Sequence, residues 1–404
     1  MLRELSRVTI MALAGLVATL AFGGAAQAAS EKVLYSFSGG IDGNGPTSAV
    51  VFDAAGSLYS TTQAGGSAGF GTVFKISPSS GGTWSENVLY SFLGGADGNT
   101  PSASVIFDKS GNLYGTTYFG GTAQLGTVFK LSSNPDGTWT ETTIHTFSGL
   151  DGSNPTANLV FGAAGNLYGT TSTGGATDGG TAFELTPNGD GSWSEKVIFN
   201  FPNNTAGGAD PYAGLTVDSS GNLYGITLYG GNKTLGNVFE LSPSSTGWTI
   251  KNLHAFAGNP DGQYPEASVI FDTAGNLYST TVAGGTATCS CGTVFRLTPS
   301  GSGWIEKTLH SFNGTPGNGP FAGLILDSAN NLYGAAYETS TRIGGMIFEI
   351  NLATGAFSDL HNFGGAGDGT GPLGTLILDS TGNLYGTTLS GGAFGAGTVY
   401  EVTP

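Results

Sequence analysis

The sequence predicts an all-β protein, a seven-bladed β-propeller built from four-stranded blades. A Gly-Asn-Leu-Tyr motif, with small variants, recurs seven times in the 404 residues, and each repeat also holds four short runs rich in β-branched and aromatic residues. The motif tyrosines are spaced by 52 to 56 residues and are Tyr59, Tyr114, Tyr168, Tyr224, Tyr278, Tyr333 and Tyr385. A period of this length built from short strands is typical of propellers and solenoids, and four strands make a propeller blade.

The second repeat illustrates the four expected strands in order. They are residues 104–108 (SVIFD), 112–117 (NLYGTT), 126–131 (GTVFKL) and 139–147 (WTETTIHTF). Each run is bounded by Gly, Pro, Asn or Asp, which favour turns, and a Gly-Gly loop separates the second run from the third.

The two ends of the chain predict how the ring closes. The last repeat supplies only three strands, whereas residues 31–37 (EKVLYSF) match the fourth strand of the other repeats. We therefore expect the N-terminal strand to complete the seventh blade, which removes two exposed strand edges.

Charged residues recur on the third and fourth strands. The third strand carries one charge in every repeat, and six fourth strands carry the opposite sign, at Lys32, Glu86, Glu141, Lys196, Lys251 and Glu306. Opposite charges on adjacent strands stabilise pairing. The glutamates and the lysines differ by one residue in register, so they cannot share one geometry.

Residues 1–29 have the pattern of a secretory signal peptide. Arg3 and Arg7 precede an apolar run over residues 8–22, and Ala26-Gln27-Ala28 resembles a cleavage site. The run is short for a membrane span, although an uncleaved anchor is the alternative. We expect residues 30–404 to form the propeller domain, a secreted or periplasmic monomer without a membrane span.

Composition excludes some partners. The formal net charge is −16 with only 12 Lys and Arg, so a nucleic-acid partner, which requires clustered cations, is not expected. The two cysteines, Cys289 and Cys291, are too few for a disulfide scaffold. We expect a local disulfide in an oxidising compartment; a thiol metal site, for which no further ligands lie nearby, is the alternative.

Two sets of polar residues follow the repeat. The histidines His145, His254, His310 and His361 occupy one position of the fourth strand, so they should lie on different blades and serve structure. The loop from the fourth strand to the first supplies Asp42, Asp97, Asp151, Asp261 and Asp368, with Asp210 in a variant. A Gly-containing turn ended by Pro explains this ring of carboxylates; weak calcium binding is the alternative, and no other cofactor is expected.

Repeats that depart from the pattern mark a candidate ligand site. The sixth repeat lacks the Gly-Gly loop, and the fourth has a longer loop over residues 202–212. The candidate ligand-binding residues in such loops are Tyr118, Tyr212, Tyr229, Tyr337, Glu338 and Arg342. Drift of the repeats without function is the competing explanation.

The sequence contains no catalytic motif that names a reaction. The leading prediction is therefore a non-catalytic binding module for a glycan, peptide or protein on the Asp-rich loop face. The alternatives are a polysaccharide-active hydrolase or lyase, with candidates Tyr337, Glu338, Arg342 and Asp210, and a structural envelope or matrix component.

The combination of GNLYGTT, Gly-Gly, GTVFKL and a Trp-led fourth strand resembles the GloVer tandem-repeat proteins of bacteria, over nearly all of residues 31–404. This resemblance implies an exported repeat array and provides no catalytic residues to transfer. Members carry varied C-terminal anchors, and none is visible here, which favours a free secreted or periplasmic protein. The Asp-x-x-Gly-Asn-Leu-Tyr hairpin is also similar to hairpins of NHL-type propellers.

Overall fold

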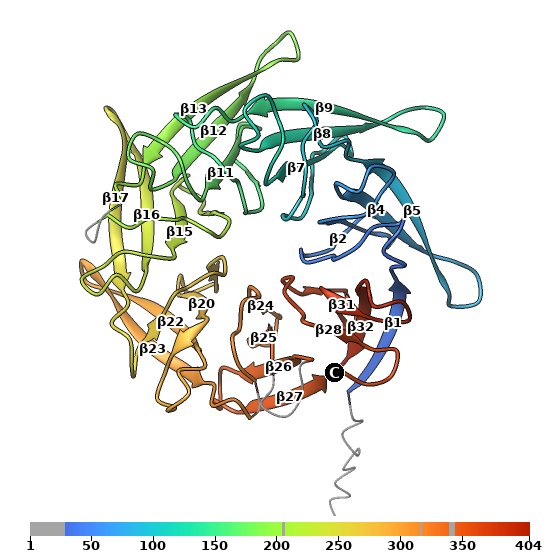
Figure 1. The fold of residues 1–404 in the computed structure, drawn as a ribbon. Coiled ribbons are helices and arrows are strands. Elements are labelled where there is room, and N and C mark those ends of the chain that lie inside the picture. Colours follow the sequence, from blue (N-terminus) through green and yellow to red (C-terminus); the bar gives the residue numbers. More distant parts are fainter. Residues whose placement is uncertain (1–28, 204–206, 316, 339–343) are drawn as a thin grey trace, which may run out of the picture.

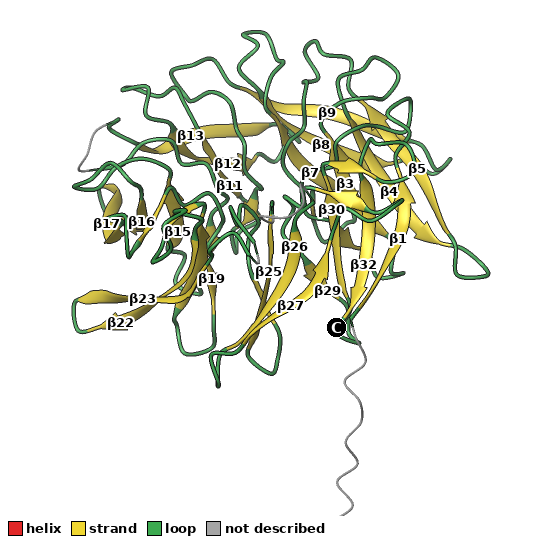
Figure 2. Cartoon of the chain, turned by 60° about the horizontal axis from the view of Figure 1, so that its bottom comes forward, coloured by secondary structure: helices red, strands yellow, loops and turns green. Residues whose placement is uncertain are grey.

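The computed structural model describes residues 29–203, 207–315, 317–338 and 344–404. These residues form seven four-stranded antiparallel sheets that surround a central axis, as blades of a propeller (Figure 1). Strands and loops make up the described chain, with no helix among its residues (Figure 2). The predicted fold class is therefore confirmed. No helix in the described part of the chain is long and apolar enough to cross a membrane.

The blades follow one another around the ring, each running from its inner strand to its outer strand. Blade 1 is β2 (Val51–Phe52), β3 (Leu58–Thr62), β4 (Thr72–Pro78) and β5 (Trp84–Ser91); blade 2 is β6 (Ile106–Phe107), β7 (Leu113–Thr117), β8 (Thr127–Ser133) and β9 (Trp139–Thr146); blade 3 is β10 (Val160–Phe161), β11 (Leu167–Thr171), β12 (Thr181–Pro187) and β13 (Trp193–Asn200). Blade 4 is β14 (Thr216–Val217), β15 (Leu223–Thr227), β16 (Asn237–Ser244) and β17 (Gly247–Ala255); blade 5 is β19 (Ile270–Phe271), β20 (Leu277–Thr281), β22 (Thr293–Ser300) and β23 (Gly303–Ser311); blade 6 is β24 (Ile325–Leu326), β25 (Asn331–Ala336), β26 (Met346–Asn351) and β27 (Phe357–Asn362).

Blade 7 closes the ring with both ends of the chain. It consists of β29 (Ile377–Leu378), β30 (Leu384–Thr388), β32 (Thr398–Thr403) and, as its outer strand, β1 (Ser30–Ser36). The antiparallel pairing of β1 with β32 confirms the predicted closure (Figure 1). Two short ribbons join loops of neighbouring strands: β18 (Gly262–Gln263) with β21 (Ala283–Gly284), and β28 (Gly369–Thr370) with β31 (Ser390–Gly391).

The hydrophobic core lies between the blades. An aromatic residue at the end of each outer strand packs against an aromatic residue on the third strand of the next blade, with ring centroids 4.8 to 5.4 Å apart. The outer-strand residues are fully or almost fully buried and are Phe37, Phe92, Phe147, Phe201, Phe256, Phe312 and Phe363. Each contact between two blades, called a junction below, is therefore held by the same aromatic pair.

The strand register explains the two classes of charge on the fourth strand. Lys196 lies directly opposite Glu184, and Lys251 lies opposite Glu240, as the sequence predicts for cross-strand neighbours. Glu86, in contrast, lies opposite Ile76. Because adjacent positions of a strand point to opposite faces of the sheet, the glutamates face away from these charges and into a junction.

Candidate functional site

A central cavity of about 640 Å³ opens among the innermost segments of all seven blades. In every blade a proline precedes the first strand, and the residue after that proline lines the cavity. We call these residues the post-proline ring: Thr47, Ser102, Thr156, Tyr212, Glu266, Phe321 and Leu373.

The prolines that position this ring are docked on glycines of the preceding blade. Gly71, just before β4, has a φ of +99°, and a Cβ placed on it would lie 2.5 Å from Pro101 Cδ. Both the backbone conformation and the close approach therefore require glycine at this point. The same contact recurs in all seven junctions, including the one between Gly397 and Pro46 across the closure of the ring.

The post-proline ring is chemically asymmetric. Blades 1 to 3 contribute hydroxyl side chains, blade 4 contributes Tyr212, blade 5 contributes Glu266, and blades 6 and 7 contribute Phe321 and Leu373. Consecutive blades are neighbours in space, so one side of the cavity offers hydroxyl groups and the other offers aromatic and apolar surface with one carboxylate. Such a mixture of apolar walls and few polar groups is typical of ligand sites.

Loops after the second strand add a further layer of aromatic residues. Tyr118 and Phe119 line the cavity and meet edge to face, with centroids 4.5 Å apart. Tyr337 also lines it and packs against Phe321 at 5.7 Å. The structure thus brings three of the predicted ligand-binding residues, Tyr118, Tyr212 and Tyr337, to one cavity.

The other candidate residues lie elsewhere. Tyr229 is 47% exposed, packs on Tyr264 and does not line the cavity. Glu338 pairs through its backbone with Asn318 and is also absent from the lining. Arg342 lies outside the described residues.

Two carboxyl groups, those of Glu266 and Asp210, lie close enough to each other to interact electrostatically. Burial raises the pKa of Glu266 to about 7, and the nearby Asp210 contributes to the shift. Burial alone raises the pKa of Asp210 to about 6, and its Oδ1 is buried without a hydrogen-bond partner among the described residues. Burial also raises the pKa of Tyr212, with smaller contributions from Glu266, Asp210 and Tyr118.

Glu266 is the functional candidate that sequence reasoning missed. The repeat itself contained the signal, because position 266 is the only one of the seven post-proline positions with a charged side chain. A search for irregular loops misses Glu266, because this residue follows Pro265 in a loop that keeps the regular Asp-Gly pattern.

The five aspartates of the predicted ring are each held by their own blade. Asp42 accepts hydrogen bonds from the Ser38 backbone N–H at 2.7 Å and from the Tyr35 hydroxyl at 3.1 Å. In the other blades the fourth-strand partner of the aspartate is Tyr90 for Asp97, His145 for Asp151, His254 for Asp261 and His361 for Asp368. These three histidines lie on separate blades, in β9, β17 and β27, as predicted.

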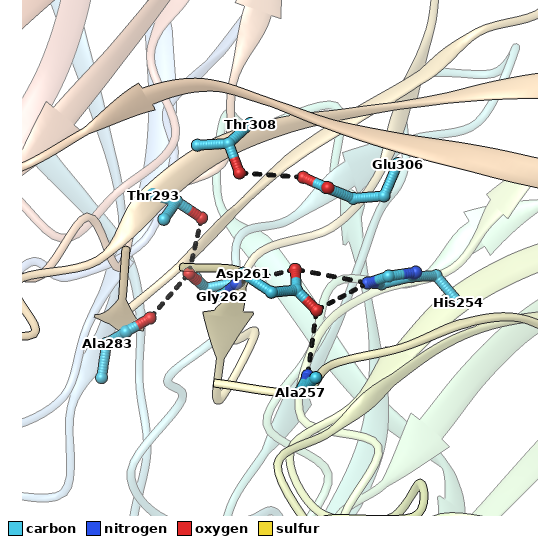
Figure 3. A network of polar contacts seen from close by, with 9 residues as sticks. His254, Ala257, Asp261, Gly262, Ala283, Thr293, Glu306 and Thr308 are labelled. Carbon is cyan, nitrogen blue, oxygen red and sulfur yellow. Dashed lines mark hydrogen bonds and ion pairs between the residues drawn. The ribbon is translucent and has the colours of Figure 1, made fainter. Parts of the chain in front are cut away.

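A glutamate from the next blade faces each of these aspartates across the junction. The pKa values of Glu31, Glu86, Glu141 and Glu195 are raised to about 7, first by burial and then by the neighbouring aspartate. Figure 3 shows the same arrangement for His254, Asp261 and Glu306, where Glu306 accepts a hydrogen bond from Thr308 at 3.1 Å. Each of these junctions therefore holds a pair of carboxyl groups, one from an aspartate and one from a glutamate of the next blade.

Two of these junctions bring a histidine, an aspartate and a glutamate close enough to share a cation. The ligand atoms of His145, Asp151 and Glu195 lie within 4.8 Å of one another, as do those of Glu31, His361 and Asp368. Tyrosine replaces the histidine in two other junctions with the same carboxyl pair, so the repeated unit is the carboxyl pair rather than a histidine site. Calcium binding at the aspartates stays a prediction.

The two cysteines lie in the loop between β21 and β22. Cys289 and Cys291 are joined by a disulfide, with Cα atoms 5.2 Å apart, as the sequence predicts for a local bridge.

Comparison with known sequences identifies the repeat. A family model described as the Gloeobacter/Verrucomicrobia repeat matches residues 19–138, 85–290 and 268–404, which together span nearly the whole chain. No curated protein matches the sequence.

Solved structures share the fold at low sequence identity. A candidate 6-phosphogluconolactonase of Bacteroides uniformis is 14% identical with a TM-score of 0.52, over 82% of this chain and 88% of that one. The extracellular domains of a candidate one-component system and a candidate hybrid two-component system of B. thetaiotaomicron are each 13% identical, with TM-scores of 0.55 and 0.54. This chain covers 39% and 41% of those two, and they cover 89% and 93% of it. At such identities the likeness shows the fold alone.

Proposed function

The chain belongs to the Gloeobacter/Verrucomicrobia repeat family, and from this premise we propose that it is an exported propeller that binds a glycan at the post-proline ring. The observation that carries the proposal is the convergence of Tyr118, Tyr212 and Tyr337, from blades 2, 4 and 6, on one cavity that hydroxyl side chains of blades 1 to 3 also line. Aromatic faces stack on the apolar faces of sugar rings, and hydroxyl side chains exchange hydrogen bonds with sugar hydroxyls.

Binding without catalysis fits the carboxyl groups better than hydrolysis. Glycosidases use two carboxyl groups that both flank the scissile bond, about 5 to 9.5 Å apart. Among the described residues, Glu266 is the only carboxyl group that lines the cavity, and Asp210 is buried beside it. The raised pKa values of Glu266 and Asp210 are the one observation that favours the alternative, a hydrolase or lyase.

Export is the second part of the proposal. It is supported by the signal-peptide pattern of residues 1–29 and by the extracellular setting of two structural neighbours. Expression of the full chain in a bacterial host with a secretory pathway should yield a mature protein that starts near residue 30. Intact mass and N-terminal sequencing of the exported fraction would check this, and an uncleaved protein held in the cells would contradict it.

A glycan array probed with residues 30–404 tests the binding function. We expect at least one class of oligosaccharide to bind, and Tyr212→Ala or Tyr337→Ala to weaken that binding about tenfold or more, which corresponds to about 1.4 kcal/mol. Tyr229→Ala is the matched control, because this tyrosine is exposed but lies outside the cavity.

The outcomes separate the three functions. An empty array, with and without calcium, would contradict glycan binding and favour a protein partner or a structural role. Cleavage of a bound oligosaccharide, lost in Glu266→Gln, would establish the hydrolase or lyase instead.

A further inference from the structure

The charge of the cavity limits the ligands that it can hold. Its lining consists of hydroxyl, amide, aromatic and small apolar side chains, with Glu266 as the only charged one among the described residues. No described lysine, arginine or histidine lines the cavity to neutralise it. Asp210 is close enough to Glu266 to contribute to the raised pKa of that residue, and its buried Oδ1 has no hydrogen-bond partner among the described residues.

The neighbours of Glu266 on the post-proline ring are both aromatic. Tyr212 precedes it on blade 4, and Phe321 follows it on blade 6. A carboxylate between aromatic rings suits a protonated amine, since the cation gains a charge-assisted hydrogen bond to the carboxylate and attraction to the ring faces. A neutral or anionic ligand would leave Glu266 without such a partner.

We propose that the glycan bound at the post-proline ring carries a free amino group, as an unacetylated hexosamine does. This inference rests on the proposed glycan-binding function. The amine lies at Glu266 between Tyr212 and Phe321, the sugar rings lie against the aromatic side of the cavity, and their hydroxyl groups face Thr47, Ser102 and Thr156.

Two oligosaccharides that differ only in acetylation test the inference. Binding of a β-1,4-linked glucosamine hexamer and of the matching N-acetylglucosamine hexamer to residues 30–404 would be measured by calorimetry. The chain is strongly acidic, with a formal charge of −16, so the titrations are run at 50 and 500 mM salt to separate site binding from general attraction of a polycation. We expect the free amine to bind at least tenfold more tightly at both salt concentrations.

Matched variants locate the preference. Glu266→Gln keeps the shape of the side chain and should abolish the preference for the amine. Glu306→Gln removes an equal charge at a junction and should leave the preference unchanged. Thermal unfolding of both variants confirms that they fold.

Each remaining result has a defined meaning. Equal binding of the two hexamers, or a preference that survives Glu266→Gln or disappears at 500 mM salt, would overturn the amine inference while the glycan function stands. If neither hexamer binds but other sugars on the array do, the amine inference is wrong. If no glycan binds and an oligolysine peptide does, the glycan function and the inference both fail, and a cationic peptide becomes the ligand.

Discussion

Five of the loops that connect one blade to the next differ from the other two. The two classes differ in the loop itself, in the side chains of the adjoining junction and in the residue that they place on the cavity. Five loops carry an aspartate held by a fourth-strand tyrosine or histidine. In the loops that enter blades 4 and 6, Gly207 and Pro316 stand at the aspartate position in the sequence. These two loops are the ones that place an aromatic residue, Tyr212 or Phe321, on the post-proline ring.

The rest of each junction changes with the aspartate. Phe199 replaces the tyrosine or histidine before the fourth blade, and Ile250 takes the place of the junction glutamate, opposite Leu241. Before the sixth blade, His310 stacks on Phe357, which takes the glutamate position opposite Ile350, with ring centroids 3.9 Å apart. Burial lowers the pKa of His310 to about 4.

The comparison teaches that the aspartate and the glutamate of a junction are replaced together, whereas the fourth-strand residue is apolar in one of these two junctions (Phe199) and a histidine in the other (His310). Without the aspartate, a buried tyrosine hydroxyl would lack its hydrogen-bond acceptor, and an unpaired buried polar group is costly. When the aspartate and the glutamate are replaced together, the loop no longer has to hold an aspartate in place. These two inter-blade loops are the ones that carry an aromatic post-proline side chain to the central cavity.

The largest effect on stability should come from breaking a polar junction. Asp97→Ala leaves the Tyr90 hydroxyl and the backbone N–H groups of Leu93 and Gly95 without their acceptor. We expect a loss of about 1–3 kcal/mol in the free energy of unfolding, measured by denaturant titration. Asp210→Asn is the control, because asparagine also tolerates the φ of 58° at this position and the Asp210 Oδ1 has no hydrogen-bond partner among the described residues. Equal losses in the two variants would contradict the comparison.

A pH dependence should follow from the junction glutamates. The pKa of Glu86 is raised from 4.5 to about 7, mainly by burial and then by Asp42, so the folded state binds a proton more tightly than the unfolded state. Stability should therefore be greatest near pH 5 and fall as the pH rises through about 7.

The Glu86→Gln/Glu141→Gln double variant should flatten this decline, because its side chains at both junctions do not titrate. Glu338→Gln, outside the junctions, should leave the slope as it is. Urea midpoints at several pH values between 5 and 8 would measure the effect, and a slope that is unchanged in the double variant would refute it.

The smallest effect on stability should come from removing one hydroxyl group from a junction that has the aspartate, or adding one to a junction that lacks it. Tyr90→Phe loses the hydrogen bond to Asp97 and should cost about 0.5–1.5 kcal/mol. Phe199→Tyr adds a hydroxyl where no junction aspartate exists and should bring no gain. Denaturant titrations of the two variants suffice, and a stabilised Phe199→Tyr protein would show that the apolar junction can accommodate a polar group.

The sequence predicts the fold well because the repeat period and the unmatched end strands are local patterns. The mismatch in register between Glu86 and the lysines is also visible in the sequence, but only the ring brings Asp42 of the preceding loop close to Glu86. The candidate site is predicted in part. Tyr118, Tyr212 and Tyr337 converge, whereas Tyr229 packs on Tyr264, because loop sequence does not determine the direction of a side chain. The sequence shows Glu266 as the one charged post-proline residue, but its place on the cavity follows from the proline docking, which depends on contacts between blades.

The pairing of Ser30 with Thr403 gives the ring a use in protein engineering. Because these two residues are strand neighbours, a short linker could join them, and new termini could be opened in the exposed turn at Gly81 and Gly82. The circular permutant would contain β32 and β1 as one hairpin, so that blade 7 is continuous in sequence, and would place the break in blade 1. Ligand binding by such a permutant would show that the ring can be cut at a different blade without harm to the cavity.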